Sequence, residues 1–139
     1  GLMTVLWVHV MATWFMVGVI WFVQVVHYPL MKQVGVTGYV TYQADHMRRT
    51  TWVVGPGMLV EAFTGVWLLF VGASIFLWMG LGLLVLIWLS TVLLQVPRHN
   101  QLLLRFDGEH HRMLVQTNWI RTFAWTARGI LCLGMLQMG

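Results

Sequence analysis

Two oppositely charged residues stand inside otherwise apolar stretches of this 139-residue sequence. Glu61 lies nine residues after Trp52, and Arg128 lies nine residues after Trp119. If each tryptophan marks the point where a helix enters a membrane, both charges fall near the bilayer midplane, where a lone charge costs about 2.5–3.5 kcal/mol. We therefore predict a Glu61–Arg128 ion pair. It either fixes helix register or serves a site, in which Arg128 holds an anionic headgroup, propionate or quinone oxygen, or Glu61 relays a proton.

His9, in the first apolar stretch, is the best single candidate for a cofactor ligand. A neutral imidazole can ligate haem iron, with a methionine as a known second ligand, and imidazole with sulfur also suits copper. The alternative is a structural His9 that is hydrogen-bonded to a neighbouring helix. The sulfur-bearing residues expected on the same side of the membrane are Met79, Cys132, Met135 and Met138.

Five histidines gather on the opposite side of the expected membrane, together with three acids. Histidines and carboxylates together could bind zinc or iron. However, metal sites in helix bundles use Glu-x-x-His pairs, and this sequence has none, so the alternative is a set of polar residues that cover the helix ends. The residues are His27, His46, His99, His110 and His111, with Asp45, Asp107 and Glu109.

The composition requires a membrane environment for the elements that position these residues. Hydrophobic residues make up 59% and charged residues 9%, whereas a soluble domain carries about 25% charged residues. This excludes a water-soluble globular domain and a disordered chain. The eight Lys and Arg beside four acids are too few for a nucleic-acid binder, and a single cysteine, Cys132, excludes an internal disulfide.

Four stretches are long enough to cross the hydrocarbon core, which takes about 20 apolar residues. We predict a single domain over residues 1–139, an all-α integral membrane protein in which four transmembrane helices form a bundle. Residues 2–26 carry no charge, and we interpret them as a membrane helix rather than a signal peptide. Pro29 and Pro97 are expected to end the first and third spans. The spans are about 2–28, 52–71, 75–96 and 118–138.

The basic residues predict the orientation of these helices. Six of them lie in the connections between spans one and two and between spans three and four, and the turn at 72–74 has none. The positive-inside rule places both connections, each expected to form a short interfacial helix, in the cytoplasm and both termini on the periplasmic side of a bacterial inner membrane. The six residues are Lys32, Arg48, Arg49, Arg98, Arg105 and Arg112.

The first span has two distinct faces. His9 and His27 are separated by about five full α-helical turns, so they are expected on one face. Thr13, Met16, Ile20 and Gln24 lie on or near this face, which we expect to point into the bundle. A stripe of tryptophans at heptad spacing covers another face and is expected to contact lipid, a partner subunit or a bound pigment: Trp7, Trp14 and Trp21.

The two halves of the chain share a faint pattern. Asp45-His46-Met47-Arg48 resembles Glu109-His110-His111-Arg112, and each segment is followed by the tryptophan that begins a span. Parallel repeats about an axis along the membrane normal occur in membrane proteins. The pattern is therefore consistent with two parallel helix-pair repeats, although unequal spacings leave a bundle without repeats as the alternative.

Longer segments carry two resemblances. The segments VQVVHYPL (23–30), LSTVLLQVPRHN (89–100) and TNWIRTFAWTAR (117–128) resemble a group of small four-helix bacterial membrane proteins. More distantly, His9, Met47-Arg48-Arg49, Pro56 and Gly65 in the first half are similar to the HemJ-type protoporphyrinogen oxidases. That resemblance implies b-type haem bound by His9, with Arg48 and Arg49 at the mouth of span two. The family usually has a lysine in span three, which is missing between Ile75 and Val96.

Three functions follow from these observations. The first is an accessory or assembly subunit of a larger membrane complex, because the chain is small, tryptophan-rich and without a soluble domain. The second is a redox protein or oxidase that binds haem b or another tetrapyrrole through His9, with Glu61, Arg128, Met79 and Met135 as further candidate cofactor residues. The third is a metal-binding or transport protein. The expected partners are the lipid bilayer and other membrane subunits or a second copy of the chain.

Overall fold

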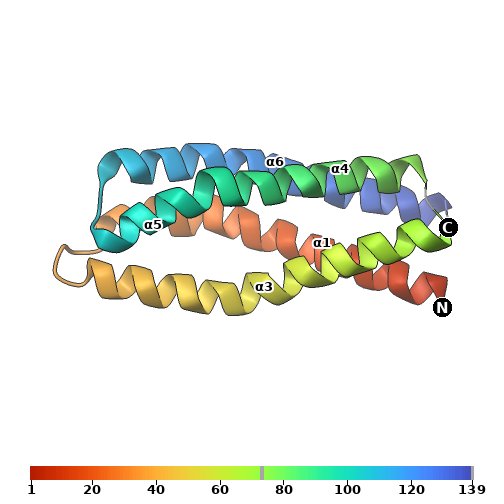
Figure 1. Ribbon diagram of the computed structural model, residues 1–139, viewed down its shortest axis with the longest axis horizontal. Coiled ribbons are helices and arrows are strands. Elements are labelled where there is room, and N and C mark those ends of the chain that lie inside the picture. Colours follow the sequence, from red (N-terminus) through yellow and green to blue (C-terminus); the bar gives the residue numbers. More distant parts are fainter. Residues whose placement is uncertain (73, 139) are drawn as a thin grey trace.

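The computed structural model describes residues 1–72 and 74–138, and over these residues the chain is all-helical (Figure 1). Four long helical rods run side by side along the molecule, which confirms the predicted all-α bundle. The first rod consists of α1 (Leu2–Phe22), the π-helix η1 (Val23–His27), α2 (Tyr28–Leu30) and the 3-10 turn η2 (Met31–Gln33). The second is α3 (Tyr39–Val71). The third consists of α4 (Ile75–Ser90), the π-helix η3 (Thr91–Gln95) and α5 (Val96–Leu104). The fourth is α6 (Gly108–Met138).

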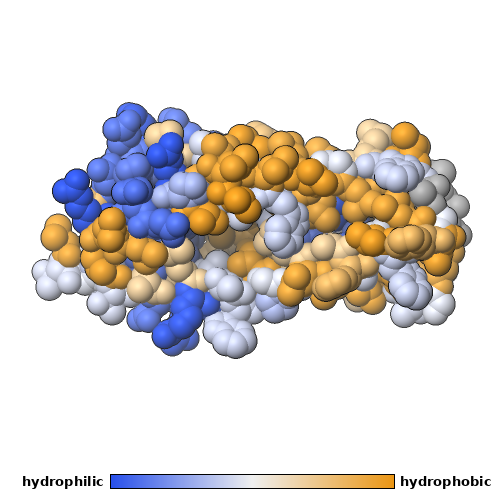
Figure 2. All heavy atoms as spheres, viewed as in Figure 1, coloured by the Kyte–Doolittle hydropathy of each residue, from blue (hydrophilic) through white to orange (hydrophobic). Residues whose placement is uncertain are grey.

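The distribution of hydropathy is that of a membrane protein. Among the described residues, three rods are long and apolar enough to cross a membrane: Leu2–Gln33, Tyr39–Val71 and Ile75–Leu104. Hydrophilic side chains gather at the end of the molecule that holds both connections, and apolar side chains cover most of the remainder of the visible face (Figure 2). The fourth rod, α6, is less apolar because it carries Arg121 and Arg128 among its buried residues.

The helices extend well beyond the predicted spans. Only residues 34–38 and 105–107 connect the rods at one end, while the start of α1, the end of α3, the start of α4 and the end of α6 lie at the other end (Figure 1). The prediction of long connections with separate interfacial helices was therefore wrong. The rods end at Gln33 and Leu104 and begin at Tyr39 and Gly108, so the polar segments continue the membrane helices as helical extensions.

Pro29 and Pro97 do not end their helices as predicted, because each follows a π-helix. A proline ring normally clashes with the carbonyl four residues earlier and removes one hydrogen bond. In a π-helix the bonds run from i to i+5, which widens the turn just before each proline. Pro29 and Pro97 then occupy the first turns of α2 and α5, where proline is tolerated.

Side-chain caps begin two of the rods. The Ser74 hydroxyl accepts a 3.2 Å hydrogen bond from the Leu77 amide at the start of α4. The Asp107 carboxylate accepts 3.0 Å hydrogen bonds from the Glu109 and His110 amides at the start of α6. These bonds satisfy backbone donors that the first turn of a helix leaves free. The His110 amide, followed by the Glu109 amide, lowers the pKa of Asp107.

The buried side chains form three apolar clusters along the bundle. The cluster near the termini includes Leu6, Leu68 and Met135, and the middle cluster includes Met16, Ile87 and Trp125. The cluster near the connections includes Tyr28, Leu102 and Leu114. Polar side chains lie between and within these layers, and together they form the candidate sites.

Candidate functional site

The predicted ion pair between Glu61 and Arg128 is confirmed. Arg128 Nη2 lies 3.0 Å from Glu61 Oε2, and both side chains are fully buried. Glu61 comes from α3 and Arg128 from α6, and both of these helices pack against α1. The two charges neutralise each other inside the bundle, where a single buried charge would be costly.

Neutral partners engage further hydrogen-bonding groups of this pair. Arg128 donates from Nη1 to the Gly80 carbonyl at 2.6 Å and from Nη2 to the Thr13 hydroxyl at 3.3 Å. The Trp125 indole N–H donates to Glu61 Oε1 at 3.0 Å. The pair therefore ties α1, α3, α4 and α6 together, which is the role of a residue pair that fixes helix register.

His9 is fully buried and has one free nitrogen. Its Nδ1 lies 2.7 Å from the Thr64 hydroxyl, which itself donates to the Val60 carbonyl at 2.6 Å. With the Thr64 proton directed at the Val60 carbonyl, His9 Nδ1 donates to Thr64 and Nε2 carries a lone pair. Among the described residues, Nε2 has no hydrogen-bond partner. A free imidazole nitrogen is what the predicted ligand role requires, and that role stays a prediction.

The surroundings of His9 do not offer the space that a tetrapyrrole needs. A Cβ on Gly65 would lie 3.3 Å from His9 Cε1 and 2.7 Å from the Leu81 side chain, so these groups are tightly packed. The principal cavities between the described helices do not include His9 in their linings. The residues present fit a nitrogen ligand but not a bound haem.

The sulfur-bearing candidates are spread over different environments. Met79 is 50% exposed, whereas Met135 and Cys132 are buried. The side chain of Met138 lies outside the described residues. Met135 packs beside Gly80, next to the Glu61–Arg128 pair, and of Met79 and Met135 it is the one placed toward the interior.

The five histidines near the connections contact different partners, except that His27 and His46 contact each other. Throughout residues 1–72 and 74–138, no three His, Cys, Asp or Glu side chains converge as metal ligands. His27 stacks on His46 with ring centroids 3.5 Å apart. His99 is hydrogen-bonded to Tyr28 and Gln43, His110 lies 3.3 Å from Arg98, and His111 lies 2.6 Å from the Tyr28 carbonyl.

His9 and His27 both contact α3, but they lie in different surroundings. His9 is fully buried against Thr64, whereas His27 is half-buried beside His46, in the groove between the first rod and α3. The π-helix η1 contributes to this difference. Successive residues in its wider turn are rotated about the helix axis by less than the roughly 100° of an α-helix, so His27 is turned away from the face that His9 occupies. The other residues expected on this face are buried as predicted: Thr13, Met16, Ile20 and Gln24.

The tryptophan stripe is partly an internal contact. The Trp21 indole donates to the Thr126 hydroxyl at 3.0 Å and meets Trp119 edge-on. A Cβ on Gly129 would lie 2.9 Å from the Trp14 ring, so that ring lies against α6. Trp7 is the most exposed of the three, at 51%, and leaves the largest surface for lipid or a partner.

Arg121 is a buried cation that the sequence interpretation overlooked. It is only 8% exposed and donates to three neutral groups: Asn118 Oδ1 at 2.9 Å, the Thr91 hydroxyl at 3.1 Å and the Tyr28 hydroxyl at 3.3 Å. A guanidinium has five N–H donors, so two remain available. Arg121 precedes Arg128 by seven residues, or two helical turns, and this spacing could have placed it on the same buried face.

The acids of the chain are engaged elsewhere. Asp45 pairs with Arg48 at 3.0 Å, Glu61 pairs with Arg128, and Asp107 caps α6. Glu109 is exposed in the first turn of α6. Among the described residues, Arg121 thus has no carboxylate partner.

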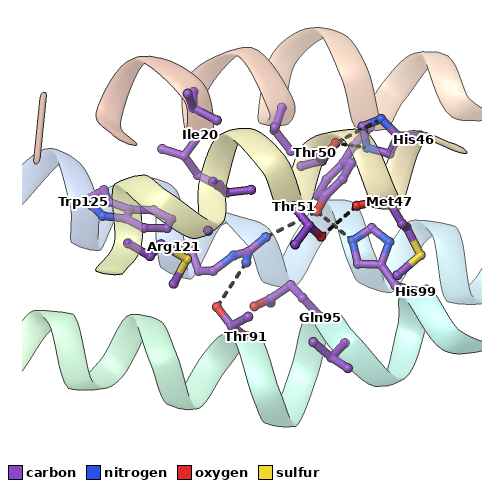
Figure 3. Close-up of a pocket in the computed structure, with 17 residues that line it drawn as sticks. Ile20, His46, Met47, Thr50, Thr51, Thr91, Gln95, His99, Arg121 and Trp125 are labelled. Atoms are coloured by element: carbon purple, nitrogen blue, oxygen red, sulfur yellow. Dashed lines mark hydrogen bonds between the residues drawn. The ribbon is translucent and has the colours of Figure 1, made fainter. Parts of the chain in front are cut away.

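A cavity of about 250 Å³ lies beside Arg121 (Figure 3). All four rods contribute to its wall, and its exposed lining residues, Thr51 and Val96, come from α3 and α5. The cavity therefore opens between these two helices. Polar groups line the part near Arg121 and His99, and the rest is mainly apolar. The principal apolar residues are Val19, Ile20, Val23, Val54, Met58 and Trp125.

No protein-family model matches this chain, and comparisons with curated proteins and with solved structures likewise give no match. The two resemblances drawn from the sequence therefore stay predictions.

Proposed function

We propose that this protein is a four-span membrane protein that binds an anionic amphiphile, a molecule with a carboxylate or phosphate head and an apolar body, in the cavity beside Arg121. The observation that carries the proposal is the buried Arg121 guanidinium, which faces a cavity without a carboxylate partner among the described residues. In this proposal α6 is the fourth span, and both connections lie in the cytoplasm of a bacterium whose inner membrane holds the protein.

The charge of Arg121 favours an anionic head. A buried unpaired charge is strongly unfavourable, and an anion that enters the cavity would neutralise it. Guanidinium groups bind carboxylate and phosphate in a bidentate way. The bonds to Asn118, Thr91 and Tyr28 hold the group in place and leave two N–H donors for the ligand.

The rest of the cavity favours an apolar body. Ile20, Val54, Met58 and Trp125 supply apolar wall, and the opening between α3 and α5 lies on the flank of the bundle. Ligand sites of this kind combine apolar walls with a few placed polar groups. A molecule that dissolves in the bilayer could enter from the side.

Thermal unfolding of the detergent-solubilised protein tests this proposal with oleate, an alkyl phosphate of equal chain length and the uncharged oleyl alcohol. We expect one or both anions to stabilise the protein, by about 2.7 kcal/mol at one hundred times the dissociation constant, and the alcohol to have little effect. The phosphate and carboxylate arms distinguish the two heads.

The substitution Arg121→Gln should abolish stabilisation by the anions. Arg112→Gln is the matched control, because Arg112 is an exposed arginine of the same helix outside the cavity. Equal stabilisation of both variants would show that Arg121 does not hold the head. A Soret band in the purified protein would instead favour a bound haem.

A second candidate function is that of an accessory subunit, and the exposure of α3 favours it. Only 17% of the apolar stretch of α3 is buried, against 39% and 28% for the first and third rods. Large aromatic side chains stand on its exposed surface, among them Trp52, Phe63, Trp67 and Phe70. A photo-reactive residue in place of Trp67 should give one discrete membrane-protein adduct, whereas the same residue in place of Leu93 on η3 should not. Lipid adducts alone at both positions would contradict this candidate.

Matched features support the further proposal that the two helix pairs are repeats. The π-helices begin at Val23 and Thr91, and each is followed by a proline at the same interval. The offset between Glu61 and Arg128 along the chain equals the offset between Thr13 and Gly80, the two neutral groups that accept from Arg128. The offset between the starts of the two π-helices is nearly the same. A pseudo-twofold axis along the membrane normal would relate such positions.

A further inference from the structure

A second hollow lies on the outside of the bundle, in the groove between the first rod and α3. Its volume is about 650 Å³, and only these two rods line it. It is separate from the Arg121 cavity, although His46, Thr50, Val19 and Val23 stand between the two and contribute to both. The groove is lined by Trp14, Phe15, Gly18, Val19, Phe22, Val23, His27, His46, Arg49, Thr50 and Val53.

The polarity of the groove changes along its length. Aromatic and aliphatic side chains line it from Trp14 to Phe22, and the polar groups of His27, His46 and Arg49 stand at the end near the connections. Trp14 and His27 are separated by about 20 Å along a helix. Half of a hydrocarbon core is about 15 Å. The groove thus spans about one leaflet, with its charged end at the level of the headgroups.

Arg49 provides a free positive charge at that end. The neighbouring Arg48 is paired with Asp45 at 3.0 Å, but Arg49 is exposed and forms no ion pair among the described residues. His27, at the same end, stacks on His46 with ring centroids 3.5 Å apart, so the two imidazoles form the wall of the groove beside Arg49. The Arg49 guanidinium suits a phosphate, which accepts charge-assisted hydrogen bonds.

Gly18 leaves room for an apolar chain in the middle of the groove. A Cβ on Gly18 would meet nothing within 4 Å, whereas a Cβ on Gly57, Gly65 or Gly129 would collide with a side chain of another helix. Glycine inside a helix is unfavourable relative to alanine, and no close helix contact accounts for it at position 18. The open surface over Gly18 leaves space in which an acyl chain can lie.

We propose that this groove binds one anionic phospholipid from the leaflet next to the connections. Its phosphate contacts Arg49, and one acyl chain lies along α1 over Gly18 between Phe15 and Val53. This site is independent of the amphiphile proposed for the Arg121 cavity, and it requires only that the bundle lie in a membrane.

Native mass spectrometry of the protein released from nanodiscs of equal parts phosphatidylglycerol and phosphatidylcholine tests the site. We expect one phosphatidylglycerol to stay bound in preference to phosphatidylcholine. Arg49→Gln should weaken this binding about tenfold or more, as the loss of one charge-assisted hydrogen bond does. Arg48→Gln, which removes an adjacent charge outside the groove, should leave the binding unchanged.

A second pair of variants tests the position of the acyl chain. Gly18→Leu should fill the groove and reduce the binding of phosphatidylglycerol, whereas Gly82→Leu should not, because Gly82 on α4 is equally open and lies outside the groove. Arg121→Gln should keep the lipid, which separates this site from the cavity.

Four results would overturn the proposal. They are equal binding of the two lipids by the unaltered protein, equal effects of the Arg49 and Arg48 variants, equal effects of the two leucine variants, and a change of oligomeric mass in Gly18→Leu. The last result would show that a second copy of the chain, rather than a lipid, occupies the groove.

Discussion

Two buried arginines on the same face of α6 have different kinds of partner. Arg128 has a carboxylate partner in Glu61, whereas Arg121 is held only by neutral oxygen atoms. Removing one member of a buried ion pair is costly, because its partner is then left as an unpaired charge in a medium of low dielectric constant. The two residues should therefore respond differently to the same substitution.

For the ion pair, we expect Glu61→Gln and Arg128→Gln each to lower the free energy of unfolding by about 3–5 kcal/mol. The double variant should recover part of this loss, because no unpaired charge then remains. Reversible unfolding in mixed detergent micelles would measure the cycle. Strictly additive losses would show that the two charges do not stabilise each other.

For Arg121, we expect replacement by glutamine to lower the free energy of unfolding less than replacement of Arg128 does when no ligand is present. The change removes three hydrogen bonds but also removes a buried charge that has no ionic partner among the described residues. The same unfolding measurement on both variants decides this. An equal or larger loss for Arg121→Gln would indicate that Arg121 is mainly a structural residue.

At the scale of elements, the two π-helices are fastened to α6 by buried glutamines. Gln24 Oε1 accepts from Asn118 Nδ2 at 2.9 Å and from the Thr122 hydroxyl at 3.0 Å, and its Nε2 donates to the Val115 carbonyl at 3.0 Å. Gln95 makes one such bond, in which Nε2 donates to the Thr117 hydroxyl at 3.1 Å, and its Oε1 accepts from the Ser90 hydroxyl of α4 at 2.9 Å. These contacts hold each wider turn against the core.

We predict that Gln24→Leu destabilises the protein more than Gln95→Leu. Each buried polar group left without a partner costs about 1–3 kcal/mol, and Gln24 satisfies three groups of α6 whereas Gln95 satisfies one. Chemical unfolding of the two variants compares them directly, since glutamine and leucine are similar in size. A greater loss for Gln95→Leu would mean that η3 depends on its glutamine more than η1 does.

The Asp107 cap should make the start of α6 sensitive to acid. The folded-state pKa of Asp107 is below its ordinary value of 3.8, so its contribution is complete above that value and disappears as the pH falls through the lower folded pKa. Asp107→Ala should therefore speed amide exchange at Glu109 and His110 at pH 7, and the difference from the unaltered protein should shrink in strong acid. Asp107→Asn, which keeps the cap, should retain protection at both pH values.

At the scale of the whole molecule, the sequence was most informative where the signal was a matter of hydropathy and depth. The distance from Trp52 and Trp119 was enough to pair Glu61 with Arg128, because a deep acid and a deep base have few other partners. Helix ends were less predictable. A π-helical turn changes the direction in which the following side chains point but leaves the hydropathy of the sequence unchanged. The sequence therefore did not indicate that the first helical rod continues past Pro29 or that His27 is partly exposed.

Arg121 shows another limit. The sequence analysis overlooked it, although its spacing from Arg128 pointed to the buried face, and the packing of α6 against α1 and α4 shows that it is buried. The cavity beside it depends on the separation of α3 and α5, which no local pattern of residues determines.

The placement of both connections at one end leads to a prediction about topology. Cysteines introduced in place of Lys32 and Arg105 should react with a membrane-impermeant maleimide only after the cytoplasmic side is opened, because basic connections stay in the cytoplasm. The native Cys132 is buried and provides little background. Labelling of intact cells from outside would reverse the proposed orientation.

The arginines of α6 also bear on the order in which this chain enters a membrane. An arginine at the centre of a helix opposes insertion by about 2.5–3.5 kcal/mol, and α6 has two buried arginines. Their partners Glu61, Thr13, Thr91 and Tyr28 all belong to segments that a ribosome makes earlier. In the four-span arrangement, α6 would be stable in the bilayer after it leaves the translocon only if those segments are already inserted next to it. Synthesis of the last helix would then be coupled to tertiary assembly, and a defect in α3 would appear as a failure of biogenesis before it appeared as a loss of stability.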